Sequence, residues 1–337
     1  MTAPLTPESQ LESHFVDEAP VDDNESGPIV SKSPGQLARA RFLKDKLSMA
    51  ALVIVILYVL AAITAPVLVA VGVLDPYSAN QDLLNEFQLP IGSWGGISGD
   101  HLLGVEPGIG RDVLARVWYG ISFSLAISLT ATIIAVLIGV TLGIVSGASG
   151  GWVDAIIGRA IDLTLAFPQT LMLLALSTVA IAFITEVLGV PEGPPAQSLY
   201  VVVVLGLFGW TSVARIVRGQ VLSLREREFV AASQMMGASK LRLYFREILP
   251  NLWAPILVTF TLIMPAFVSA EAALAFLNVS IRPPTPTLGN VLSDSLKFAE
   301  NDPVYFFVPA ILIAAIVVSF NLLGDGLRDA LDPKGHQ

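Results

Sequence analysis

The sequence predicts an all-α polytopic membrane protein with six transmembrane helices. Of its 337 residues, 54% are hydrophobic and only 14% are charged, whereas soluble domains carry roughly 25% charged residues. The chain also contains several long apolar stretches, each close to the length of about 20 residues that a helix needs to cross a bilayer. These stretches lie at about 47–72, 121–145, 161–185, 199–219, 253–277 and 305–324.

The segment before the first apolar stretch is acidic. Residues 1–31 contain seven Asp or Glu residues and no Lys or Arg, and they are rich in Pro, Ser and Thr. Such a composition buries too little apolar surface to offset the entropy lost on ordering. We therefore expect residues 1–36 to be a disordered cytoplasmic tail, followed by the first transmembrane region at 37–73. A cleavable signal peptide is not expected, since the first long apolar stretch begins only near residue 47.

A loop of irregular structure is predicted between the first two spans, at 74–120. It contains three prolines and a glycine-rich run at 91–96, and both features are typical of turns. Only its end is expected to be helical, because Val113, Leu114 and Val117 have helical apolar spacing.

Basic residues fall mainly on one side of the predicted bundle. Six spans return both termini to the same side, and a cytoplasmic N-terminus places 15 of the 19 Lys and Arg residues in the cytoplasm. Because cytoplasmic loops of membrane proteins are enriched in positive residues, both termini are expected there and the 74–120 loop outside. Residues 121–334 then form a five-helix core with a cytoplasmic loop at 225–251.

This cytoplasmic loop is too polar to cross the membrane. Gly237 is expected to end one helix, and Ser239 to cap a second one. The second helix carries an apolar row with the spacing i, i+3, i+4 and i+7, formed by Leu241, Tyr244, Phe245 and Ile248. Such a row fits either a basic amphipathic helix on the anionic inner leaflet or a docking element for a cytoplasmic protein. The pattern alone leaves both interpretations open.

The loop resembles the "EAA" loop of permease subunits of bacterial ATP-binding cassette (ABC) importers. Gly237 is followed thirteen positions later by Pro250, as in that loop. Three further segments resemble the C-type subunit of the dipeptide/oligopeptide permease family, at 101–114, 271–277 and 321–333. The resemblance covers roughly residues 37–334, so the acidic tail lies outside it.

The resemblance implies a type I ABC importer permease-like fold in the bacterial inner membrane. The chain would be a membrane-spanning permease subunit that couples ATPase motion to alternating access, with peptides as the favoured substrate; nickel chelates and oligosaccharides stay open. Its implied partners are a second homologous permease subunit, two cytoplasmic ATPase subunits that bind ATP and Mg, and an extracytoplasmic solute-binding protein. No cofactor is expected in this chain, and no nucleic-acid partner.

By the same resemblance, the loop docks the ATPases. The residues expected at this contact are Glu228, Ala231, Ala232, Gly237, Ala238, Leu241, Tyr244, Phe245, Ile248, Leu249 and Pro250. The chain departs from the family at Ala231, where Glu is common, so no carboxylate role carries over to that position. Glu228, nearly one helical turn earlier, could replace it in part, although a solvated surface charge is the favoured interpretation. Glu247 stands where a basic residue or His is expected, which leaves the apolar row intact.

An enzyme is disfavoured by the residues that are missing. The chain has no cysteine and three widely separated histidines, so neither a metal site nor a catalytic site is expected. It also lacks a Gly-x-x-x-x-Gly-Lys-Ser/Thr segment, so ATP hydrolysis is expected on partner chains. A receptor or scaffold would not explain four motif segments in the order of the family.

An ion-coupled secondary transporter or channel is the main alternative, and it would place ionisable groups deep in the spans. Glu271 is the one carboxylate well inside a predicted span. A hydrogen-bonded group that fastens two helices is favoured there over a contact in the substrate path. Glycines spaced four apart at Gly139, Gly143 and Gly147 predict close helix packing.

Overall fold

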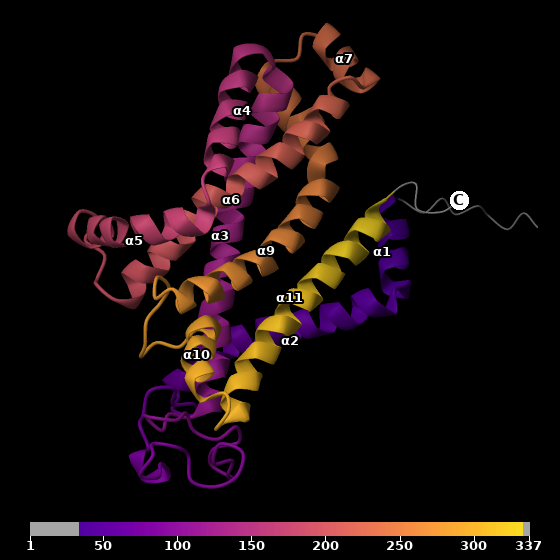
Figure 1. The fold of residues 1–337 in the computed structure, drawn as a ribbon. Helices are drawn as coiled ribbons and strands as arrows, with labels where there is room; N and C mark the ends of the chain where they lie inside the picture. Colours follow the sequence, from indigo (N-terminus) through magenta and orange to yellow (C-terminus); the bar gives the residue numbers. More distant parts are fainter. Residues whose placement is uncertain (1–33, 333–337) are drawn as a thin grey trace, which may run out of the picture.

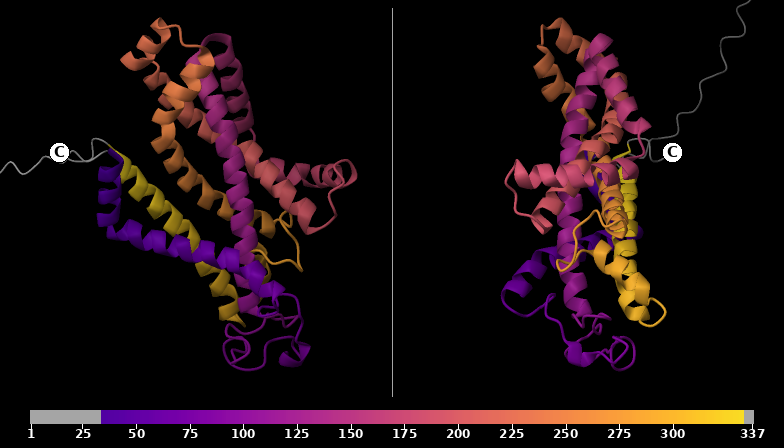
Figure 2. Two further views of the ribbon diagram at one scale, coloured as in Figure 1. Left: turned by 180° about the vertical axis from the view of Figure 1, so that it is seen from behind. Right: turned by 60° about the vertical axis from the view of Figure 1, so that its left-hand side comes forward.

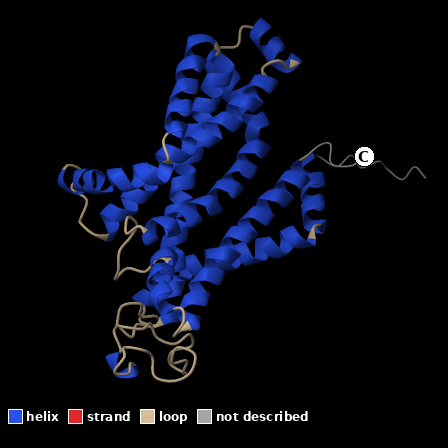
Figure 3. Cartoon of the chain, viewed as in Figure 1, coloured by secondary structure: helices blue, strands red, loops and turns tan. Residues whose placement is uncertain are grey.

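The computed structural model describes residues 34–332. Within this range the regular structure is helical apart from two isolated β-bridges (Figures 1 and 3). Eleven α-helices are found there, namely α1 (Pro34–Lys44), α2 (Lys46–Ala70), α3 (Val113–Ser149), α4 (Gly151–Ala166), α5 (Gln169–Glu186), α6 (Pro194–Leu224), α7 (Glu228–Met235), α8 (Lys240–Arg242), α9 (Trp253–Phe276), α10 (Leu288–Ser295) and α11 (Pro303–Leu331). A π-helical turn at Leu243–Ile248 and a 3₁₀ turn at Leu249–Leu252 join α8 to α9, and further 3₁₀ turns lie at Gln81–Leu83 and Leu296–Phe298.

Six helical segments in the described residues are long and apolar enough to cross a membrane, which confirms the predicted number. They are α2, α3, α5, α6, the continuous segment Lys240–Phe276, and α11. The irregular loop between α2 and α3 lies at one end of the molecule, and α4 and α7 lie at the other (Figures 1 and 2). We call these the loop end and the α7 end.

The third span begins later than predicted. The apolar stretch expected at 161–185 is divided between α4 and α5, because α4 ends at Ala166 and Phe167 has an extended backbone. Pro168 disfavours helical conformation for the residue before it. The span is therefore α5, and α4 is a separate helix that folds back beside α3.

Two other helix starts bear on the predicted boundaries. Helix α1 begins at Pro34, inside the tail predicted at 1–36, and the rest of that tail lies outside the described residues. Helix α3 begins at Val113, in the end of the 74–120 loop that was expected to be helical. Its first two turns contain Arg116, whose charge keeps them out of the apolar stretch at 121–145, and Asp112 caps the helix by accepting a 2.6 Å hydrogen bond from the Ala115 backbone N–H.

The glycine steps of α3 pack against α6, as the sequence predicts. A Cβ on Gly143 would lie 2.8 Å from the Val217 Cβ, and one on Gly147 would lie 2.8 Å from the Val221 Cβ. Gly139 faces Val213 in the same way. The two helices therefore run parallel, with valines of α6 fitting over glycines of α3. This contact fixes the α7 end of α6, from which the 225–251 loop departs.

Candidate functional site

The loop that follows α6 has the helix, glycine turn and helix order that the sequence predicts. Helix α7 ends at Met235, and Gly237 has a φ of +79°, a conformation that glycine adopts without steric cost. Ser239 caps α8, since its Oγ accepts a hydrogen bond from the Arg242 backbone N–H. The second helix is not short, however, because it continues through Leu243–Leu252 into α9. The turn is thus connected directly to a membrane span.

The predicted apolar row does not form one exposed surface. Leu241 is 68% exposed and Phe245 is 57% exposed, but Tyr244 and Ile248 are buried. The buried pair packs with the valines of α6 and with α3, and the Tyr244 hydroxyl lies 2.8 Å from the Ser149 Oγ. The expectation that all four residues face a partner is therefore wrong. Each i, i+4 pair occupies its own side of the helix, and the bundle covers one of the two.

Three exposed apolar residues beside the turn were not predicted as docking residues. Phe229, Met235 and Met236 are 40%, 83% and 78% exposed. We call these three residues, together with the exposed Leu241 and Phe245 on the other side of the turn, the apolar tip. Two consecutive methionines before a turn glycine are the sequence signal that could have identified it, because Met is common at adaptable binding surfaces.

The other predicted docking residues lie around this tip. Those that are exposed are Glu228, Ala231, Ala232, Gly237 and Pro250, and those that are partly buried are Ala238 and Leu249. Helix α7 is anchored by Val230 and Ser233, which are buried. The exposed alanines leave its outer face flat, so another protein can approach the backbone closely.

An ion pair braces the base of the loop. The Arg218 guanidinium of α6 donates to both carboxylate oxygens of Asp154 in α4, at 2.6 and 2.7 Å. This hydrogen bonding lowers the pKa of Asp154 from 3.8 to about 2. Arg225, at the end of α6, donates to the Gly147 carbonyl of α3 at 3.2 Å. These contacts tie α3, α4 and α6 together where the loop begins.

Glu271 lies inside the bundle near the loop end and is fully buried. Its carboxylate accepts a 2.7 Å hydrogen bond from the Ser280 hydroxyl and a 3.1 Å hydrogen bond from the Ser124 hydroxyl of α3. The Ser124 Oγ in turn accepts from the Leu288 backbone N–H at 3.0 Å. Glu271 thus joins α9, α3 and the start of α10, which is the geometry of a group that fastens helices.

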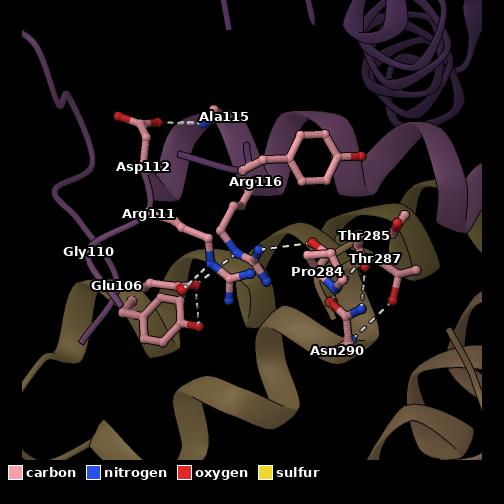
Figure 4. A network of polar contacts seen from close by, with 12 residues as sticks. Glu106, Gly110, Arg111, Asp112, Ala115, Arg116, Pro284, Thr285, Thr287 and Asn290 are labelled. Atoms are coloured by element: carbon pink, nitrogen blue, oxygen red, sulfur yellow. Dashed lines mark hydrogen bonds and ion pairs between the residues drawn. The ribbon is translucent and has the colours of Figure 1, made fainter. Parts of the chain in front are cut away.

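A second buried polar cluster at the loop end was not predicted. Arg116 is fully buried, and its Nε lies 2.9 Å from the Glu106 Oε2. Arg111 also pairs with Glu106, and Arg116 donates to the Pro284 carbonyl at 3.3 Å (Figure 4). The Tyr305 hydroxyl of α11 donates to Glu106 at 3.3 Å. The cluster fixes the irregular loop to α3, α11 and the segment before α10.

No group of three or more potential metal ligands occurs within residues 34–332. The carboxylates and guanidiniums just described have protein partners, so they hold helices together. The α7 end differs from these polar clusters, because its exposed side chains near the Gly237 turn are apolar. Such a surface suits binding of another protein.

Comparison with known proteins gives two family matches. Residues 139–336 match the family described as "Binding-protein-dependent transport system inner membrane component". Residues 33–90 match the "N-terminal TM domain of oligopeptide transport permease C". The first match contains the whole 225–251 loop, and the second contains α1 and α2.

Relatives and solved structures agree with these matches. The chain is 38% identical to the oligopeptide transport system permease protein OppC of Bacillus subtilis, over 88% of each chain. It is 36% identical to the dipeptide transport system permease protein DppC of Alkalihalophilus pseudofirmus, over 90% of each chain. Its fold is similar to a chain of the inward-facing MetNI methionine ABC transporter, with a TM-score of 0.52, 17% identity, and coverage of 65% of this chain and 96% of that one.

The fold and its central motif loop thus agree with one family and give no support to an ion-coupled carrier or channel. The chain belongs to the family of inner membrane components of binding-protein-dependent transport systems.

Proposed function

We propose that this chain is a permease subunit of an ATP-driven importer whose substrates are di- or oligopeptides. The proposal is supported by relatives that are named oligopeptide and dipeptide permeases and that match along nearly the whole chain. The structural observation that carries it is the apolar tip, which surrounds the Gly237 turn and continues into the span Lys240–Phe276. A force applied at the tip is thereby transmitted into the membrane.

The partners in this proposal are a second homologous permease subunit, two cytoplasmic ATPases that bind ATP and Mg, and an extracytoplasmic solute-binding protein. The ATPases dock on the apolar tip, with Leu241 and Phe245 inserted into a groove. Tyr244 and Ile248 do not contact the ATPases; they pack inside the protein and hold the turn against α3 and α6. Closure of the ATPases then moves the turn and α9 together, and the path opens alternately on the two sides.

Transport assays distinguish this function from the ion-coupled alternative. The complex containing this chain is reconstituted in proteoliposomes with its ATPases and binding protein, and uptake of radiolabelled tri-alanine is measured. Uptake should require ATP inside the vesicles and persist when ionophores collapse ion gradients. Uptake that is driven by an ion gradient without ATP would contradict the proposal.

The proposed orientation places both termini and the 225–251 loop in the cytoplasm of a bacterial inner-membrane protein. It is supported by the 15 of 19 basic residues that then lie inside, and by the contact between the two ends of the described chain, where Arg41 donates to the Asp332 carbonyl at 3.0 Å. The chain is free of cysteine, so single cysteines can report the side. Ser98→Cys should react with an impermeant reagent from outside and Ser239→Cys should not; the opposite pattern would invert the topology.

A further inference from the structure

A polar pocket of about 380 Å³ lies at the loop end, between α5, the start of α6 and the segment after α9. This volume lies within the range of about 300–1,000 Å³ that is typical of ligand pockets. Polar and charged side chains line it, including Thr178, Glu186, Glu192, Gln197, Asn278 and Arg282. In the proposed orientation the pocket opens in the extracytoplasmic half of the bundle.

Four polar residues of α5 line the pocket, namely Ser177, Thr178, Thr185 and Glu186, and the apolar Ile181 and Ala182 lie between them on the same wall. We call these four residues the polar stripe of α5. Hydroxyl and carboxylate groups are costly against lipid. Helix α5 projects from the rest of the bundle in Figure 1, and the pocket lies against the second half of this helix.

The charges of the pocket are not neutralised by one another. No carboxylate in residues 34–332 lies within 4.0 Å of the Arg282 guanidinium, and neither Glu186 nor Glu192 has a basic partner in that range. The guanidinium donates one hydrogen bond, of 3.2 Å, to the Asn278 carbonyl. Its remaining N–H groups are therefore available for a bidentate contact with a carboxylate.

The segment that carries Arg282 is held in place on both sides. The Arg282 backbone N–H donates to the Gln197 side-chain oxygen at 3.0 Å. Ser280, two residues earlier, donates to the buried Glu271, and Asn290 donates to the Ile281 carbonyl at 3.1 Å. The backbone around Arg282 is thus held in place, and the pocket lining combines this cation with the carboxylates of Glu186 and Glu192. Such a combination of charges suits a zwitterion.

We propose that this pocket binds the two ends of a short peptide during transport. The terminal carboxylate pairs with Arg282, and the terminal ammonium group pairs with Glu186 and Glu192. The inference rests on the proposed peptide transport and adds a peptide site in this chain, separate from the binding protein. The polar stripe of α5 contacts the peptide backbone between the two ends.

Cysteine protection tests the site directly. Thr178→Cys is introduced into the complex, purified without the binding protein, and its reaction rate with an impermeant maleimide is measured with and without tri-alanine. Binding slows labelling by a factor of 1 + [L]/Kd, so a peptide at ten times its Kd should protect about eleven-fold. N-acetyl tri-alanine amide, which has the same length and no terminal charge, should give no protection. Ser98→Cys, which lies outside the pocket, should react at the same rate with tri-alanine, with the blocked peptide and without peptide.

Charge variants in the Thr178→Cys background identify the recognising groups. Arg282→Gln should weaken protection by tri-alanine about ten-fold or more, because a charge-assisted contact is lost. Lys297→Gln removes a basic residue of the same end that does not line the pocket, and it should leave protection unchanged. Glu186→Gln combined with Glu192→Gln should abolish the preference for a free amino group over an acetylated one.

The outcomes separate this inference from the proposed function. If the complete complex imports tri-alanine but labelling of Thr178→Cys is the same with and without it, the pocket does not bind peptide and the proposed function stands. Equal protection by the free and the blocked peptide would overturn recognition of the terminal charges. If the complete complex imports no peptide, the proposed function fails and the pocket proposal fails with it.

Discussion

Substitution of Gly237 by Val should uncouple the ATPases from transport. The residue has a φ of +79° at the turn between α7 and α8, and no atom outside its own neighbours lies within 4 Å of the position that a Cβ would occupy. A side chain there meets no steric obstacle from the rest of the protein, so the cost is confined to the backbone. A branched residue in the left-handed region costs about 1–3 kcal/mol.

This cost is large for a local turn. Because 1.4 kcal/mol is a factor of ten in an equilibrium constant, the population of the native turn should fall by roughly 5- to 140-fold. The apolar tip has residues on both sides of the turn, so its Met236 and Leu241 side chains would no longer be presented together. Both ATPase association and transport should therefore decrease, while membrane insertion is unaffected.

The assay is co-purification of the ATPases with the variant, together with ATP-dependent uptake in proteoliposomes. Gly237→Asn should be tolerated much better, because Asn adopts the left-handed conformation more readily than branched residues do. Gly219→Val is the matched control, since Gly219 is exposed at the same end of α6, has no atom within 4 Å of its Cβ position and has no positive φ. Normal assembly and uptake with Gly237→Val would refute the role assigned to the turn.

Three further predictions test the packing, the brace and the tip. Gly143→Leu should overpack the α3–α6 contact, where a Cβ would lie 2.8 Å from the Val217 Cβ, and cost about 1–3 kcal/mol; an unchanged Tm in detergent would contradict that contact. Asp154→Asn should lower the Tm at neutral pH. Because the Arg218 contact lowers the Asp154 pKa from 3.8 to about 2, this stabilisation is present above pH 3.8 and lost as the pH falls toward 2. The Tm difference between wild type and variant should therefore shrink over that interval, and a constant difference would exclude the ion pair as its cause. Phe245→Ala should weaken ATPase binding by about 2 kcal/mol or more and leave anionic-vesicle binding of the isolated loop segment unchanged, whereas retained and coupled ATPases would favour lipid as the partner.

Hydropathy was sufficient to predict that this chain has six apolar membrane helices. A membrane helix forms its backbone hydrogen bonds internally and exposes apolar side chains over about 20 residues. Each span is therefore visible as a single stretch of high hydropathy in the sequence. The Gly237 turn and the Ser239 cap were also predictable, because both follow from the conformational preferences of single residues. The glycine steps of α3 were visible for the same reason, since their spacing of four matches one face of a helix.

At the third span, the hydropathy of a long stretch concealed the effect of one residue. Residues 161–185 are apolar enough to suggest a single helix, but Pro168 restricts the backbone of Phe167 and divides the stretch into α4 and α5. The signal was present in the sequence as a single residue.

Only the tertiary structure decided which residues meet. The sequence could place Tyr244 and Phe245 on one amphipathic helix, but the position of α3 and α6 determines that one is buried and the other exposed. Arg116 can be buried because it pairs with Glu106. The irregular loop carries Glu106 to this position, and its turns leave no periodic pattern in the sequence from which the pair could be predicted. Likewise, Glu186 and Arg282 are 96 residues apart in sequence, and the fold brings the end of α5 and the segment after α9 to one pocket. The sequence by itself therefore determined the number of spans and the local turns, which depend on solvation and backbone conformation. The sites depend on contacts between distant segments, and these are fixed by packing of the whole bundle.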